Sequence, residues 1–261
     1  MKLPFGTAKP NRLGVALSGG GARGFAHVGA LRALRDLGLK PDIIAGVSAG
    51  SVAAVFDSAG LIDELPELFK GGKFRDFAEF LVPRNGFCSM RSFGRLIEKT
   101  IPYPTLESLP RPTVVCATEL DAGMKVAFTE GPIAERVMAS CSIPIVFEPV
   151  IIDGHRYVDG GVLRNLPAWA IRHRCDVLIG INCSPLDSSE RANGIINIAK
   201  RSYSLMAKNN VVADLELCDV VVDLMDVADH QAFNLHSLEM LVESGYLTTL
   251  RTLKASPLPQ F

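Results

Sequence analysis

Short apolar runs alternate with longer amphipathic stretches along the N-terminal part of the chain. The run Leu13–Leu17 stops at a Ser-Gly-Gly-Gly turn, which predicts a buried strand. Apolar residues then recur at helical spacing over residues 22–37. Residues 41–47 predict a second buried strand, and the small residues of 49–59 predict a second helix that ends at Gly60. The pattern therefore predicts two successive strand–turn–helix units.

The rest of the chain continues this alternation after one irregular stretch. Residues 61–112 hold six prolines and predict two or three short helices in a cap-like insertion. Further strands are expected at 113–118, 125–128, 146–152, 156–158, 177–181 and 220–224, and helices at 132–138, after Pro167, at roughly 192–213 and at roughly 237–253. Strands separated by helices predict an α/β fold with a mostly parallel sheet covered on both faces, in one domain across 1–261. Active sites of such sheets form at the carboxyl ends of the strands.

Composition and charge exclude several classes of protein. The 48% apolar and 21% charged residues are ordinary for a globular domain and exclude a disordered chain. The 27 basic and 28 acidic residues give a net charge of −1, without the basic excess of a nucleic-acid-binding protein. The six cysteines form no C-x-x-C pair, so we expect reduced core cysteines, no metal site and no cofactor.

Targeting signals are absent from the sequence pattern. The N-terminal residues lack the apolar stretch of a secretory signal, and no apolar run reaches the ~18 residues of a membrane span. We therefore expect a cytoplasmic protein that contacts membranes, if at all, from outside. The sequence pattern does not indicate which oligomeric state the protein has.

A serine stands where the second predicted strand meets the second helix, in Gly46-Val47-Ser48-Ala49-Gly50. This fits G-x-S-x-G, in which a sharp turn pushes the serine hydroxyl into a cleft. The residues two before and two after must be nearly free of side chain, and both are glycine here. The following helix adds partial positive charge where an oxyanion would form. The same residues also suit an ordinary helix N-cap, because serine is a favoured capping residue.

The glycine loop after the first strand, Gly19-Gly20-Gly21-Ala22-Arg23-Gly24, has two interpretations. It fits G-x-G-x-x-G, but a dinucleotide site also needs an acidic residue at the end of the second strand. Ser48 stands there, and Asp42 stands at the start of that strand. The other interpretation is an oxyanion hole, in which consecutive N–H groups turn toward one point of a cleft shared with Ser48. Arg23 would either hold a phosphate or pin the loop through carbonyl groups.

The sequence pattern indicates an aspartate, rather than a histidine, as the base that would activate this serine. An ordinary triad has the order serine, acid, histidine. The histidines of the chain are His27, His155, His173, His230 and His236, and none has the setting of a catalytic base. Asp159-Gly160-Gly161 instead follows a predicted strand, and its glycines would let the aspartate approach another backbone closely. The alternative is a plain turn, since Asp-Gly is also a hairpin signal.

Together these three sites resemble the patatin-like phospholipase family, whose pattern is a G-G-G-x-[RK]-G loop, a G-x-S-x-G elbow and a downstream D-G-[GA]. Residues 139–144 and 147–150 also look like the segment that precedes the aspartate in that family. The resemblance covers roughly residues 12–215. It implies a three-layer α/β/α fold, a Ser48–Asp159 dyad without histidine, and hydrolysis of lipid acyl esters such as phospholipid or lysophospholipid.

In the mechanism that this resemblance implies, Ser48 attacks an ester carbonyl while Asp159 accepts its proton and later activates water. Backbone N–H groups around residues 20–22 would hold the oxyanion. Two alternatives stay open. One is an acyltransferase of the malonyl-transacylase type, which typically carries a histidine where this chain has Val47. The other is a non-catalytic regulator that kept the fold.

Aromatic residues are dense in the cap-like segment 61–90, with basic residues among them. They are Phe69, Phe74, Phe77, Phe80 and Phe87, with Leu81, and the basic residues are Lys70, Lys73, Arg75 and Arg84. Four of the apolar residues, at 74, 77, 80 and 81, would share one helical face. That face would either pack on the core or line the mouth for an acyl chain, with the basic residues at lipid headgroups.

Overall fold

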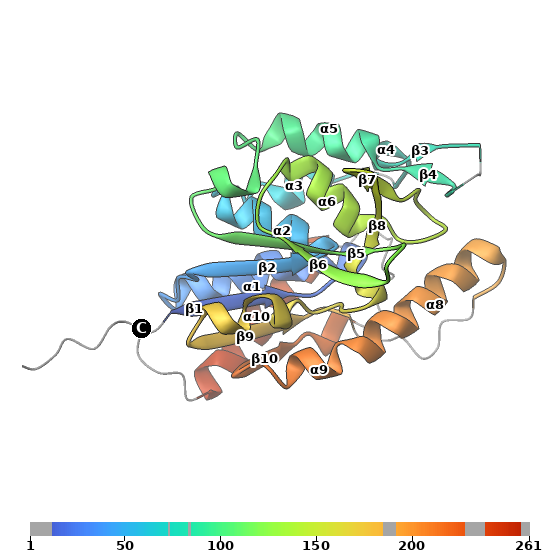
Figure 1. Cartoon of the computed structure of the whole chain (residues 1–261). Helices are drawn as coiled ribbons and strands as arrows, with labels where there is room; N and C mark the ends of the chain where they lie inside the picture. Colours follow the sequence, from blue (N-terminus) through green and yellow to red (C-terminus); the bar gives the residue numbers. More distant parts are fainter. Residues whose placement is uncertain (1–11, 73, 83–84, 185–191, 228–237, 257–261) are drawn as a thin grey trace, which may run out of the picture.

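The centre of the fold is an eight-stranded mixed sheet (Figure 1). The computed structural model describes residues 12–72, 74–82, 85–184, 192–227 and 238–256. The strand order is β10-β9-β1-β2-β5-β8-β7, and β6 pairs with β5 beside this path. The strands are β1 (Leu13–Leu17), β2 (Ile43–Val47), β5 (Thr113–Glu119), β6 (Met124–Phe128), β7 (Val150–Ile152), β8 (His155–Asp159), β9 (Val177–Asn182) and β10 (Val220–Asp223). The pairs among β10, β9, β1, β2 and β5 are parallel, and those that involve β6, β7 and β8 are antiparallel.

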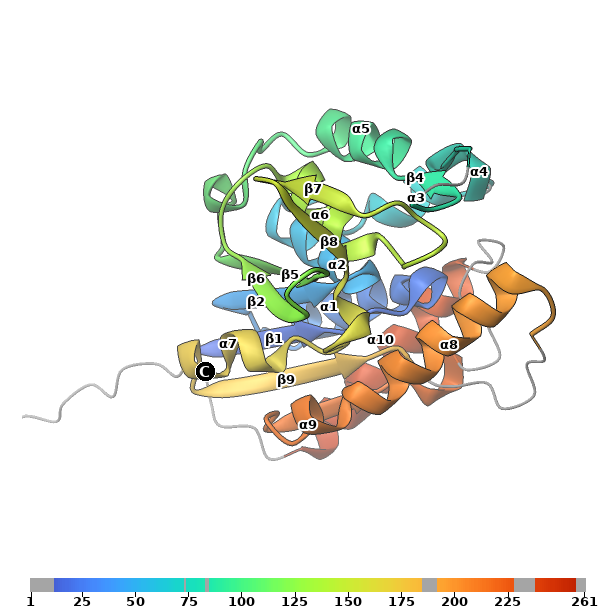
Figure 2. The same cartoon turned by 45° about the vertical axis from the view of Figure 1, so that its right-hand side comes forward.

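Helices cover both faces of this sheet and make a three-layer α/β/α arrangement (Figures 1 and 2). Large residues of β1 and β9 pack against the first layer, whereas Ala16, Ala45 and Cys116 face the second. The first layer contains α1 (Phe25–Asp36), α2 (Ala49–Ser58), α5 (Arg91–Thr100), α6 (Ile133–Cys141) and α10 (Leu238–Ala255). The second contains α7 (Ala168–Ile171), α8 (Ile195–Asn210) and α9 (Val212–Leu215). The predicted mostly parallel sheet with two covered faces is confirmed.

The two strand–turn–helix units lie side by side in register. Leu17 of β1 is opposite Gly46 of β2 and Ile181 of β9, so the carboxyl ends of these three strands are level. Each strand is fully buried, because helices cover both of its faces. The turns that follow β1 and β2 therefore begin next to each other at one edge of the sheet.

The insertion between α2 and β5 departs from the predicted pattern. It contains α3 (Leu65–Phe69), α4 (Phe74–Phe77), a hairpin of β3 (Glu79–Phe80) and β4 (Cys88–Ser89), and α5. The predicted helical face shared by residues 74, 77, 80 and 81 is wrong, because α4 ends at Phe77 and Phe80 pairs with Cys88. Phe77 packs against the core, whereas the side chain of Phe80 is 74% exposed. Lys73 and Arg84 lie outside the described residues.

Two other predicted elements are shorter than expected. The strand predicted over 146–152 is confined to Val150–Ile152, because Ile145 has a positive φ of 73° and Phe147 N–H turns back to the Ile143 carbonyl. The helix predicted over 192–213 is divided near Val211 into α8 and α9. No helix among the described residues combines the length and the apolar character that a membrane crossing requires.

Cysteine thiols fill the space beside glycines of the sheet. A Cβ atom on Gly14 would lie 2.6 Å from Sγ of Cys175, and one on Gly180 would lie 2.5 Å from Sγ of Cys218. All six cysteines are free, and four of them are buried. These thiols act as small apolar side chains, as the sequence predicted.

Helices α1 and α10 approach each other closely enough that their contact admits no side chain at two positions. A Cβ atom on Gly29 of α1 would overlap the carbonyl oxygen of Val242 and lie 2.6 Å from the backbone nitrogen of Tyr246. A Cβ atom on Gly245 of α10 would overlap the carbonyl oxygen of Ala26. The neighbouring atoms are backbone, so they cannot rotate away, and α10 is fixed against the helix that follows the glycine loop.

We predict that Gly245→Ala lowers the free energy of unfolding by about 1–3 kcal/mol, because the methyl group would push α10 from α1. Alanine is intrinsically the better helix former by about 1 kcal/mol, so a loss of stability reports the contact itself. Urea unfolding followed by circular dichroism measures the change. Leu247→Ala in the same helix, at a side chain that is 55% exposed, should change stability by less than about 0.5 kcal/mol. A Gly245→Ala variant that is as stable as the wild type, or more stable, would show that α1 and α10 can accommodate the methyl group.

Candidate active site

Ser48 occupies a strained turn between β2 and α2. Its φ and ψ are 51° and −124°, a conformation that costs a residue with a side chain about 1–3 kcal/mol. Hydrogen bonds hold it there: Ser48 N–H donates to Oγ of Ser140 at 2.8 Å, and that hydroxyl donates to the Cys116 carbonyl at 2.6 Å. Oγ of Ser51 donates to the Ser48 carbonyl at 2.7 Å. The surrounding structure thus fixes the orientation of the serine.

The glycines on either side of Ser48 lie against backbone. A Cβ atom on Gly46 would overlap the carbonyl of Gly50. A Cβ atom on Gly50 would overlap the carbonyl oxygen of Leu17 and lie 2.6 Å from that of Ser18. The start of α2 is therefore pressed against the end of β1, beside the glycine loop. Any side chain at either position would open this turn.

The glycine loop continues β1 into a short 3-10 helix, η1 (Gly21–Gly24), which leads into α1. Gly19 N–H donates to the Asn165 carbonyl at 3.1 Å, so this donor is engaged within the protein. Gly21 has φ of 60°, which favours glycine. The first N–H groups of a helix lack partners in that helix, so the N–H groups at residues 20–22 are the candidates in this loop for holding an anion. Asp42 is at the other end of β2, where its Oδ2 accepts Leu13 N–H at 2.7 Å.

A buried polar cluster lies beneath the loop. Nε2 of His27 is 2.8 Å from the Ser18 carbonyl and 3.2 Å from Sγ of Cys183, and Cys183 N–H donates to Oγ of Ser18 at 2.9 Å. Burial lowers the pKa of His27 to about 4, although the Ser18 carbonyl raises it. His27 is therefore neutral near pH 7 and ties α1 to the end of β1.

Asp159, the last residue of β8, is completely buried beside Ser48. Its Oδ1 accepts Gly161 N–H at 2.9 Å and the Tyr203 hydroxyl at 2.8 Å, while Oδ2 has no hydrogen-bond partner among the described residues. Burial raises the pKa of Asp159 to about 6, against the opposing effects of Gly161 N–H and the hydroxyls of Ser48 and Tyr203. The Ser48 hydroxyl thus lies close enough to favour the carboxylate, although no hydrogen bond of ordinary length joins it to Oδ2.

Helix α8 supplies two residues that the sequence pattern did not indicate. Tyr203 donates to Asp159, and a Cβ atom on Gly161 would overlap the Tyr203 hydroxyl. Nδ2 of Asn210 donates to the Gly161 carbonyl at 2.8 Å, and its Oδ1 accepts Asn165 N–H at 2.8 Å. Neither residue belongs to a motif, and both lie far downstream of Asp159. The second glycine of Asp159-Gly160-Gly161 leaves room for this tyrosine.

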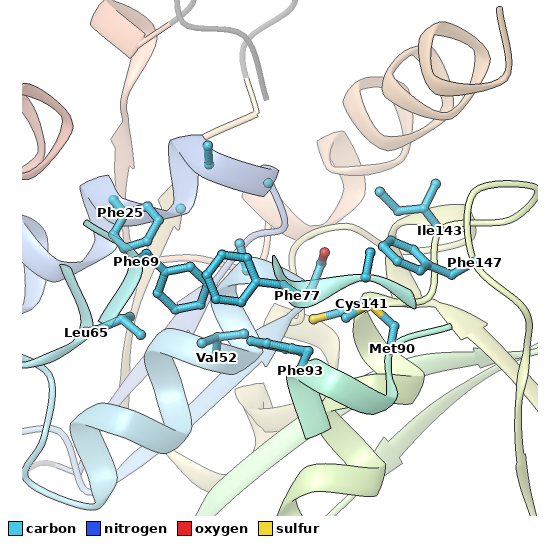
Figure 3. Close-up of a pocket in the computed structure, with 16 residues that line it drawn as sticks. Phe25, Val52, Leu65, Phe69, Phe77, Met90, Phe93, Cys141, Ile143 and Phe147 are labelled. Atoms are coloured by element: carbon cyan, nitrogen blue, oxygen red, sulfur yellow. The ribbon is translucent and has the colours of Figure 1, made fainter. Parts of the chain in front are cut away.

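An apolar cavity begins at Ser48 and extends between the first helical layer and the insertion (Figure 3). Its empty space is about 900 Å³, including the part that is open to solvent. Aromatic rings from α1, α3, α4 and α5 line it: Phe25, Phe69, Phe77 and Phe93. The rings of Phe69 and Phe77 are stacked with centroids 4.5 Å apart. Two of the aromatics predicted to form an acyl mouth therefore line a cavity at Ser48, and Phe80 does not.

A second, more polar cavity meets the first at Ser48. Gly21, Ser48 and Ile143 line both cavities. The second is smaller, with about 490 Å³ of empty space, and α8 forms one wall. Its polar lining consists of Arg23, Asn165, Ser184, Lys200, Tyr203 and Ser204. The nucleophile candidate thus stands between an apolar and a polar compartment.

Cys141 lines the apolar cavity together with Ser48. Burial raises the pKa of the Cys141 thiol, and the negative charge of Asp159 raises it further. The thiol therefore stays protonated at neutral pH and is a poor nucleophile. Within the described ranges, no group of three or more His, Cys, Asp or Glu side chains is arranged to hold a metal ion.

Comparisons with known proteins identify the family to which the chain is similar. A sequence model of the patatin-like phospholipase family matches residues 15–171. An uncharacterised NTE family protein of Mycobacterium tuberculosis (strain ATCC 25618 / H37Rv) is 36% identical over 208 residues, which cover 78% of this chain and 58% of that protein. The neuropathy target esterase sws of Drosophila melanogaster is 29% identical over 194 residues, which cover 70% of this chain and 14% of that protein.

The fold is also found among solved structures. The crystal structure of VipD from Legionella pneumophila superposes with a TM-score of 0.57 at 16% identity, over 94% of this chain and 67% of VipD. The chain spans little more than half the length of the mycobacterial relatives that it matches. The family match includes the glycine loop, the Ser48 turn and Asp159. The chain belongs to the patatin-like phospholipase family, a family of lipid hydrolases.

Proposed function

We propose that this chain hydrolyses carboxylic esters of lipids through a Ser48–Asp159 dyad, with the glycine loop as oxyanion hole. The observation that carries the proposal is the position of Ser48 in the lining of an apolar cavity, next to a buried carboxyl group with a raised pKa. A raised carboxyl pKa in a cleft is typical of a catalytic base. The family match supports hydrolysis over the malonyl-transacylase alternative.

In the proposed reaction, Oγ of Ser48 attacks the ester carbonyl carbon and its proton passes to Oδ2 of Asp159. The N–H groups of Gly20, Gly21 and Ala22 stabilise the negative charge on the carbonyl oxygen, as does the N-terminus of α2. The alcohol leaves with the proton from Asp159, and the acyl group remains on Ser48. Water then gives a proton to Asp159 and attacks the acyl group. Asp159 returns this proton to Oγ of Ser48 as the carboxylic acid leaves, which restores both the serine and the base.

The raised pKa answers the main objection to an aspartate base. A carboxyl group near pKa ~4 is too weak to take a hydroxyl proton efficiently, and burial brings Asp159 closer to the operating pH. Gly161 and Tyr203 hold one oxygen of the carboxylate and leave the other for the proton. This arrangement supports the role of Asp159 as base, because the carboxylate is held in one orientation and Oδ2 is left to accept the proton.

The two compartments support an ester with one long apolar part and one polar part. The apolar cavity would receive the acyl chain, because aromatic walls stabilise each buried CH₂ by about 0.8 kcal/mol. The polar cavity would receive the alcohol portion, such as the glycerol backbone and headgroup of a phospholipid or lysophospholipid. Arg23 and Lys200 line that side.

We predict that Ser48→Ala and Asp159→Asn each lower ester hydrolysis by about a thousandfold or more. The first substitution removes the nucleophile, and the second removes the base that accepts its proton. A fluorophosphonate should label the wild-type chain at Ser48 and leave Ser48→Ala unlabelled, as read by peptide mass spectrometry. The exposed Asp153→Asn serves as the control for Asp159→Asn. Near-wild-type hydrolysis by either dyad variant, or labelling at another residue, would rule out the dyad. A wild-type chain that is folded but does not hydrolyse esters would favour the alternative of a non-catalytic regulator.

The stability of Asp159→Asn separates lost chemistry from lost folding. The carboxyl pKa is raised on folding, so the contribution of Asp159 to wild-type stability is greatest below pH 4 and is lost as the pH rises through about 6. Above pH 6 the buried charge should cost about 3 kcal/mol relative to the amide, which still accepts from Gly161 and Tyr203. Asp159→Asn should thus unfold at a higher temperature than wild type at pH 8, and this difference should shrink toward pH 4. A difference independent of pH would show that the carboxyl group titrates normally.

We predict that kcat/KM on a dissolved ester increases about tenfold per pH unit below about pH 6 and levels off above it, because Asp159 must be deprotonated to act as base. Initial rates with an uncharged short-chain ester across pH 4.5–8 give this profile. A profile without a limb in that window would mean that another group controls the reaction.

We predict that Phe77→Ser lowers the ratio of octanoyl-ester to acetyl-ester turnover by about tenfold, because it removes an aromatic wall of the acyl compartment. Phe80→Ser is the matched control: the same change at a ring that is 74% exposed and outside the cavity should leave the ratio unchanged. Both esters are measured in monomeric solution. Equal losses on the two esters in Phe77→Ser would mean that the ring supports the fold and does not contact the acyl chain.

A further inference from the structure

Helix α8 is held to the rest of the protein by unusually little apolar contact. Of its 16 residues, all within the described part of the chain, Ala207 alone is buried. Its inner side contributes polar groups, such as Tyr203 and Asn210, to the site. In proteins most of the stability of a helix comes from packing of its apolar face rather than from helix propensity.

The outer side of α8 presents an apolar stripe to solvent. Ile195, Ile198 and Leu205 are spaced by three and seven residues, so they follow one face of the helix, and Met206 borders them. The exposed fractions are 76% for Ile195 and 54% for Ile198. β-Branched residues at the start of a helix are poor helix formers, so local helix propensity does not explain them. The stripe therefore resembles a surface that contacts another apolar surface.

The charge of α8 indicates what this face contacts. Lys200, Arg201 and Lys208 lie on the helix, and its sequence from Ile195 to Asn210 contains no Asp or Glu. The whole chain has a net charge of −1, so the positive charge is local. An amphipathic helix with an apolar stripe and only basic charged residues is typical of helices that lie in the interface of an anionic membrane.

The helix that carries the stripe also borders the site. Lys200, Tyr203 and Ser204 of α8 line the polar cavity at Ser48. Figures 1 and 2 both show the first residues of α8 and the β3–β4 hairpin at the end of the molecule toward which β1 and β2 run. Next to that hairpin, Val82 is 84% exposed. Two distant segments that carry exposed apolar side chains thus lie at the same end of the molecule as the carboxyl ends of β1 and β2.

We infer that α8 is an interfacial helix, which places its Ile195–Ile198–Leu205 face in an anionic lipid surface and brings the mouth of the site to that surface. This inference rests on the proposed function for its purpose, because lipid substrates reside in such surfaces. A lipid molecule would then enter the cavities without crossing water. The basic side chains of α8 would lie at the level of the headgroups.

The test is co-sedimentation of the full chain, carrying Ser48→Ala to prevent hydrolysis, with lipid vesicles. We expect binding to phosphatidylcholine vesicles that contain phosphatidylglycerol, weaker binding to phosphatidylcholine alone, and loss of the difference at high salt. Ile195→Asp plus Ile198→Asp should weaken binding by about tenfold or more, because two apolar anchors become charged.

The matched control makes the same chemical change on another helix. Met240→Asp plus Leu247→Asp in α10, at side chains that are 52% and 55% exposed, should bind vesicles like the parent. Circular dichroism melting of both double variants verifies that they are folded. In a Ser48 background, the α8 double variant should hydrolyse a dissolved short-chain ester at the parental rate and vesicle lipid at least about tenfold more slowly.

Several outcomes would overturn the inference. One is the absence of vesicle binding by the parent, and another is equal loss of binding in both double variants. A third is a dimer in sedimentation velocity that the α8 variant alone converts to monomer, since the face would then pair with a second copy of the chain. Failure of the proposed function is distinguishable, because it would abolish ester hydrolysis in every variant and leave vesicle binding unaffected.

Discussion

The contact between Gly50 and the carbonyl oxygens of Leu17 and Ser18 is the constraint on which the site depends. It presses the start of α2 against the end of β1, so the turn between β2 and α2 has no room to relax. Ser48 takes its positive φ as a consequence, at a cost of about 1–3 kcal/mol. Strain of this size persists only where the surroundings fix it, and here the parallel register of β1, β2 and β9 and the hydrogen bond to Ser140 do so. The same contact sets the glycine loop beside the serine hydroxyl.

Asp159 shows a conflict between stability and chemistry. A buried carboxylate with both oxygens hydrogen-bonded would have a low pKa and little tendency to take a proton. A buried carboxylate without partners would be protonated at neutral pH. The observed arrangement lies between these extremes, since Gly161 and Tyr203 hold Oδ1, and Oδ2 lacks a partner among the described residues. Native structures tolerate such a destabilising group where function requires it.

The sequence pattern predicted the parts of the site that depend on backbone geometry. A helix pressed against a strand end requires glycines at 46 and 50, and that requirement is visible in one sequence. It did not predict Tyr203, because the bond from α8 to Asp159 depends on tertiary packing and leaves no spacing signal. The aromatics of the insertion were assigned to one helix on periodicity alone. Pairing of Phe80 with Cys88 ended that helix after one turn, which turned Phe77 inward and left Phe80 exposed.

The separation of apolar and polar compartments follows from where Ser48 stands between the two helical layers. On one side the walls come from α1, α2 and the insertion, which belong to the larger core cluster and are rich in aromatic rings. On the other side the wall is α8, whose inner face is polar and whose outer face is apolar. A helix with this reversed polarity gains little from packing on its own protein. In the proposed function its two faces are compatible, because the inner one would line a wet cavity and the outer one would contact lipid. The polarity of α8 would then link the proposed chemistry at Ser48 to the surface from which a lipid ester comes.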